Sequence, residues 1–185
     1  FFAPAAPPLD TQAFFALLGS DAFPPARHRI DRSELAVQGP QGTRLAVQDF
    51  GEFAVAVAGE SLSPARPDWR RIVAGLAAGS SRFPEMAGRF SVTIVHPGSR
   101  RAWLVSDYLG QYPAWYRTTG EWVGFASSPA AFCRLPPLPG FDPGWLVDKL
   151  AFNFSPAHRS FLEGVRRMPP ASVLTLDLDS LALGM

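Results

Sequence analysis

The most regular alternation of apolar and polar positions in this chain lies in residues 88–106. Phe90, Val92 and Ile94 alternate with polar or small residues, and a two-residue period is typical of a strand in a half-buried sheet. The segment 97–100 reads Pro-Gly-Ser-Arg and predicts a turn, after which the same period resumes. We therefore expect two neighbouring strands that are joined by this turn.

A second turn and a hairpin follow directly. Asp107 begins a turn that ends at Gly110, where glycine suits a backbone with positive φ. Residues 115–117 and 122–125 are rich in aromatic and β-branched side chains and flank Thr-Gly-Glu, which predicts a β-hairpin. Asp107 is interpreted as an acceptor of backbone N–H hydrogen bonds in the turn rather than as a catalytic acid. The aromatic cluster is expected to fill a core between two sheets, and it comprises Trp103, Trp115, Tyr116 and Trp122.

Shorter apolar runs between Gly- and Pro-rich turns predict further strands. These strands are expected at residues 35–37, 44–47, 53–57 and 172–176, with turns at 39–42 and 49–52.

Four segments have helical features. The first is expected over residues 10–18, and the third is a short helix at 129–133. The second begins after Asp68 as N-cap, and the fourth begins with Asp142 as N-cap and Pro143 at the first position. The apolar stripe of the second helix consists of Trp69, Ile72, Val73 and Leu76, and that of the fourth of Trp145, Leu146, Leu150 and Phe152. Interleaved antiparallel strands and few helices predict an α+β fold, with residues 1–185 as one domain.

Composition narrows the functional classes. The chain has 185 residues, 47% of them hydrophobic, and a formal net charge of +1, so its overall charge favours neither nucleic acid nor an anionic membrane as a partner. No apolar run approaches the roughly 20 residues that cross a bilayer. The first residues lack the basic region of a secretory signal peptide. A cytoplasmic location is expected.

Candidate nucleophiles and metal ligands are few. Cys133 is the single cysteine, so no internal disulfide can form, and we interpret it as a small buried hydrophobic residue and not as a nucleophile. His28, His96 and His158 are scattered without an acidic partner at ligand spacing. No metal site and no catalytic residue is predicted.

The order of several short motifs resembles a known family. Residues 88–91 read Gly-Arg-Phe-Ser, 107–116 read Asp-Tyr-Leu-Gly-Gln-Tyr-Pro-Ala-Trp-Tyr, 125–128 read Phe-Ala-Ser-Ser, and 161–170 read Phe-Leu-Glu-Gly-Val-Arg-Arg-Met-Pro-Pro. In this order they are similar to the class II glutamine amidotransferase domain at the front of asparagine synthetases. The resemblance covers residues 45–176 and implies the N-terminal-nucleophile hydrolase fold, an αββα sandwich of two mainly antiparallel sheets.

In that family an N-terminal cysteine attacks glutamine, with its own α-amine as base. Asn and Gly form the oxyanion hole, and an Arg and an Asp hold the substrate. The resemblance places Gly59, Glu60 and Asp68 at family positions, puts Ala58 where the Asn is expected, and suggests Arg44 as the substrate arginine. Phe1-Phe2-Ala3-Pro4 stands where the cysteine is expected, and an alanine side chain cannot donate. These residues therefore predict a vestigial glutamine pocket without glutaminase activity.

The resemblance also implies a partner. In the family a synthetase domain, fused or on a separate chain, uses ATP and Mg²⁺ to activate a carboxylate. Relatives without the cysteine, the β-lactam synthetases and lasso-peptide macrolactam cyclases, use an amine of a peptide or small-molecule substrate instead of ammonia. A degenerate domain with a scaffold role in such a ligase, preferably a lasso-peptide cyclase, is the function that the resemblance favours.

Two alternatives stay open on the sequence alone. One is an active glutamine-hydrolysing asparagine synthetase whose cysteine precedes Phe1. The other is a stand-alone binding module. A homodimer is left open in either case.

Overall fold

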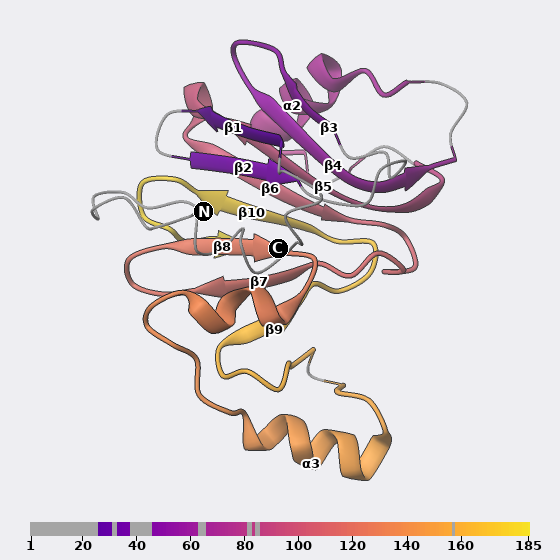
Figure 1. Ribbon diagram of the computed structural model, residues 1–185. Coiled ribbons are helices and arrows are strands. Elements are labelled where there is room, and N and C mark those ends of the chain that lie inside the picture. Colours follow the sequence, from indigo (N-terminus) through magenta and orange to yellow (C-terminus); the bar gives the residue numbers. More distant parts are fainter. Residues whose placement is uncertain are drawn as a thin grey trace.

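The computed structural model describes residues 26–30, 33–37, 46–62, 66–80, 83, 86–156 and 158–185 (Figure 1). The helix expected at 10–18, the turn at 39–42 and the candidate substrate residue Arg44 lie outside the described residues. The strand expected at 44–47 is described from Ala46 onward.

The largest element is a six-stranded sheet in which every neighbouring pair is antiparallel. Its strand order is β11-β10-β6-β5-β4-β3. The strands are β3 (Ala46–Asp49), β4 (Ala54–Ser61), β5 (Gly88–His96), β6 (Arg101–Ser106), β10 (Val173–Asp177) and β11 (Leu183–Gly184). The predicted turn between β3 and β4 is confirmed, because Asp49 Oδ1 accepts from the Gly51 N–H at 2.7 Å. Residues 97–100 join β5 to β6 as predicted, through the 3-10 helix η1 (Pro97–Ser99).

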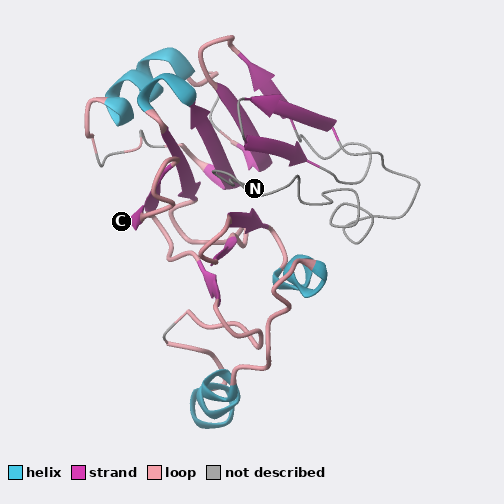
Figure 2. Cartoon of the chain, turned by 90° about the vertical axis from the view of Figure 1, so that its left-hand side faces the viewer, coloured by secondary structure: helices cyan, strands magenta, loops and turns pink. Residues whose placement is uncertain are grey.

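One face of this sheet is covered by α2 (Trp69–Ala77) (Figure 2). Asp68 is its N-cap, as predicted, and accepts from the Arg71 N–H at 3.1 Å. Trp69, Val73 and Leu76 are buried on the helix. They form one core cluster with sheet residues of alternating position, among them Val55, Phe90, Val92, Ile94, Trp103 and Val105. The stripe read from the sequence is therefore the face that α2 buries.

The other face of the large sheet packs on a smaller sheet with the order β8-β7-β9. Its strands are β7 (Trp115–Thr118), β8 (Val123–Ala126) and β9 (Val165–Arg167). Val123 of β8 clusters with Ala54, Val95 and Ala102 of the large sheet. On the far side of the small sheet lies the 3-10 helix η2 (Pro129–Arg134), whose Phe132 clusters with residues of that sheet and its turn.

The predicted α+β sandwich of two mainly antiparallel sheets is thus confirmed. Two further elements belong to neither sheet. β1 (Ala26–Ile30) and β2 (Ser33–Val37) pair with each other and lie near β3 and β4 of the large sheet. The helix α3 (Pro143–Phe152) begins at its predicted cap and proline but projects away from both sheets (Figure 1). Within the described residues, no helix is long and apolar enough to cross a membrane.

Several expectations from the sequence are wrong in instructive ways. The half-buried alternation predicted for residues 88–96 is confirmed in β5, where Phe90, Val92 and Ile94 are buried and the residues between them are only partly buried. It does not continue in β6, where every residue from Ala102 to Ser106 is buried, because α2 covers one face of the sheet and the small sheet covers the other. Strands β1, β9 and β11 were not predicted, since the last two are only three and two residues long. The apolar stripe of α3 is exposed rather than part of a core.

The aromatic cluster and the cysteine also differ from expectation. Only Tyr116 lies against the core between the two sheets. Trp103 faces α2, because it alternates along β6 with residues that face the small sheet, and Trp115 and Trp122 pack with η2. Cys133 is exposed, because η2 turns its neighbours Ala131 and Phe132 inward.

Candidate functional site

Three of the candidate pocket residues stand together at the end of β4. Ala58, Gly59 and Glu60 are paired across the ladder with residues at the start of β5. Ala58 is half-buried, Gly59 is buried, and Glu60 is exposed. The turn that follows β6 lies at the same edge, because Ser106 of β6 pairs with Ser91 of β5. We call residues 58–61, 88–91 and 107–112 the sheet-end site.

Gly59 is required here by backbone geometry. Its φ is +106°, which L side chains rarely adopt. A Cβ at this position would stand 2.1 Å from the backbone oxygen of Arg89 and 2.9 Å from the Cα of Phe90. The glycine therefore lets β4 and β5 approach each other, whatever else it does.

Glu60 has a partner across the ladder. Its carboxylate lies 3.5 Å from Arg89 Nη2, and the two side chains are 55% and 61% exposed. An ion pair this exposed contributes on the order of 0–1 kcal/mol. Glu60 is the one acidic residue of β4 that the resemblance assigns to the glutamine pocket, and its carboxylate is engaged in this ion pair.

Asp107 organises the turn beside these residues. The carboxylate is fully buried and accepts four backbone hydrogen bonds. The donors are the N–H groups of Phe90 at 3.3 Å, Leu109 at 3.0 Å, Gln111 at 2.9 Å and Tyr112 at 2.8 Å. The interpretation of Asp107 as a turn acceptor is confirmed, as is the positive φ of Gly110, which is +61°.

The same turn is tied to the small sheet. Arg167 of β9 donates through Nη2 to the backbone oxygen of Gly110 at 2.8 Å. The N–H of Ala171, between β9 and β10, donates to the backbone oxygen of Asp107 at 3.0 Å. Burial raises the pKa of the Tyr112 phenol, while a hydrogen bond with Ser127 lowers it by a smaller amount. The sheet-end site is therefore a rigid junction between the two sheets.

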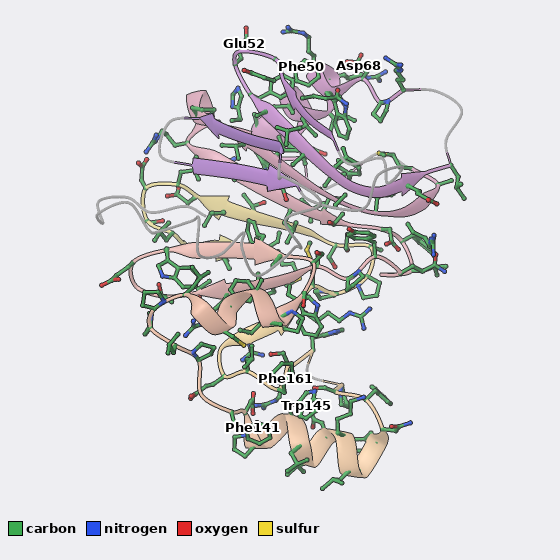
Figure 3. The ribbon with its side chains drawn as sticks, in the orientation of Figure 1. Phe50, Glu52, Asp68, Phe141, Trp145 and Phe161 are labelled. Carbon is green, nitrogen blue, oxygen red and sulfur yellow. The ribbon has the colours of Figure 1, made fainter. Side chains whose placement is uncertain are left out.

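Asp68 does not join the other candidates. It caps α2, and the first turn of that helix lies near the β3–β4 turn, because Arg70 approaches Glu52 at 3.9 Å. Figure 3 shows Asp68, Glu52 and Phe50 at this same end of the molecule. Glu60 stands eight residues further along the chain than Glu52, roughly 25 Å at the rise of an extended chain. In this structure Asp68 and the sheet-end site occupy opposite ends of β4.

The remaining candidate metal ligands and nucleophiles do not gather in the described residues. These residues contain no group of three or more His, Cys, Asp or Glu side chains placed to hold a metal ion. His96 is engaged locally, since its Nδ1 accepts from the Ser99 N–H at 3.1 Å. Cys133 lies on η2, which the small sheet separates from the large sheet that carries Gly59.

Arg117 is the buried charge that the sequence did not single out. It is 7% exposed and lies in the small sheet on β7. Its guanidinium donates to the Leu135 oxygen at 3.4 Å and stands 5.5 Å from the Trp122 ring centroid. Burial lowers the pKa of Arg117, and the nearby Glu163 carboxylate partly opposes that shift. The contact with the tryptophan face indicates a structural cation–π role.

Arg89 was also missed, although the sequence contains a signal for it. Opposite charges on paired strands attract when they face each other across a ladder. Finding the pair requires the register of β4 on β5, and that register follows from the burial of Phe90 and Val92 on one face.

Comparison with known protein families gives one match. Residues 72–183 match the family described as a glutamine amidotransferase domain. The matched segment runs from within α2 to the first residue of β11 and includes Asp107 and η2, whereas Ala58, Gly59, Glu60 and Asp68 precede it. A search of curated proteins finds no match.

Proposed function

This chain belongs to the glutamine amidotransferase domain family, and from that premise we propose that it is a degenerate member which does not hydrolyse glutamine. In this proposal the domain serves as the scaffold of an ATP-dependent amide-forming enzyme of the asparagine-synthetase kind. The observation that carries the proposal is Ala58, next to the geometrically required Gly59. Gly59, which the resemblance assigns to the oxyanion hole, is needed for the close approach of β4 and β5. Its neighbour Ala58 has no side-chain hydrogen-bond donor.

The chemical cost of this alanine is large. Developing negative charge on a tetrahedral intermediate needs preplaced donors about 3 Å away. Removal of one such donor costs about 2.7–4 kcal/mol of barrier, or 10²- to 10³-fold in rate. Ala58 leaves only backbone N–H groups as donors at this position, where β4 pairs with β5 and the described pairing with β3 ends at Val57.

Two other candidate pocket residues have structural contacts, since Glu60 pairs with Arg89 and Asp68 caps α2. Asp107, which was not a pocket candidate, holds its turn through four backbone donors. None of these contacts needs glutamine. A domain that retains the residues of its fold and lacks a donor of its oxyanion hole fits a scaffold better than a hydrolase.

The parent reaction is proposed from the resemblance. A synthetase domain, on the same or a separate chain, would activate a carboxylate with ATP and Mg²⁺, and an amine of the substrate would then attack. Macrolactam formation in a lasso peptide is the preferred case. The substrate amine replaces ammonia from glutamine, so the loss of glutamine hydrolysis would leave the ligase active.

The experiment measures glutamate and ammonia release from glutamine by the purified protein and by its Ala58→Asn variant. We expect both to stay at background, because in this proposal the domain has lost glutamine hydrolysis as a whole and one restored donor does not bring it back. A matched variant, Ala58→Val, controls for the added side-chain volume. Binding is followed separately as the change in Tm at about 10 mM glutamine, where a dead pocket gives no shift.

The variant discriminates between the two candidate functions. If Ala58→Asn raises glutamine hydrolysis about 100-fold or more, as one oxyanion donor would, the protein has a working nucleophile and the degenerate reading is wrong. Glutamine hydrolysis by the unmodified protein would contradict the proposal more directly.

A further inference from the structure

We draw no further inference here: the strongest candidate, the exposed apolar face of α3 that carries Leu146, Val147 and Leu150, is a helix surface for which nothing in the described part of the chain shows what covers it.

Discussion

The two α-helices of the described chain begin alike and end up in opposite environments. Each starts after an aspartate whose side chain accepts from N–H groups of the first turn, Asp68 in α2 and Asp142 in α3. Nine residues of α2 include three that are buried, whereas none of the ten residues of α3 is buried. Local sequence thus decides where a helix begins, and it does not decide whether the apolar face of that helix becomes core.

The difference arises from what lies opposite each stripe. The stripe of α2 meets the face of β4, β5 and β6 that carries Val92 and Ile94. The stripe of α3 meets no sheet, and the helix is held by its caps and by rings around Trp145. Stability is therefore concentrated in the two-sheet body, while the apolar stripe of α3 is exposed.

The largest effect is expected in the body, at the junction of its two sheets. Asp107→Ala removes the acceptor of four backbone N–H groups, one of them buried. An unsatisfied buried donor costs about 1–3 kcal/mol, so the free energy of unfolding should fall by about 4 kcal/mol or more. Urea denaturation measures this.

Asp107→Asn provides the control for this prediction. The amide keeps one acceptor oxygen but turns an NH₂ group toward two of the N–H donors, so it should restore only part of the lost stability. If Asp107→Ala unfolds at the same urea concentration as the unmodified protein, the carboxylate does not hold the junction.

The next largest effect compares the same substitution on the two helices. Leu76 on α2 is 2% exposed. Leu76→Ala leaves a cavity in the core and should lower the free energy of unfolding by about 2–5 kcal/mol. Leu150→Ala on α3 removes an exposed side chain, and should change the stability of the monomer by less than about 0.5 kcal/mol. Urea denaturation checks both. Equal losses would mean that α3 is part of the cooperative core.

The smallest effects concern the two caps. Asp68→Ala and Asp142→Ala each remove an N-cap acceptor, which costs about 1 kcal/mol. For α2 the loss should appear in global unfolding, since the helix belongs to the main core. For α3 the loss should appear as faster amide exchange within 143–152, with an unchanged global midpoint. A global loss of the same size from both variants would remove the distinction between the helices.

Much of the fold was accessible from the sequence because it is encoded locally. The capped starts at Asp68 and Asp142, the turn at Asp107 and the hairpin around residues 119–121 each depend on neighbours in the chain. The short strands β9 and β11 were missed, because two or three residues carry no usable period. They become strands only through pairing, β9 with the distant β7 and β11 with β10, which directly precedes it in the chain.

The candidate site divides in the same way. The sequence singled out Gly59 and Glu60 by resemblance, but it could not give the reason for the glycine, which is the Arg89 oxygen 2.1 Å from any added Cβ. It also grouped Asp68 with them, although Asp68 lies near Glu52 at the start of β4, and Gly59 and Glu60 lie at its end. The role of each as a ligand contact stays a prediction.

By itself the sequence determined which residues start and stop the elements, and through its ordered motifs it determined the family. Caps, turns and strand periods act over a few residues, so they are written in the chain directly. The tertiary structure alone decided that β6 is buried on both faces and that the stripe of α3 is bare. Burial depends on what stands opposite a surface in space, and no local pattern of residues contains that information.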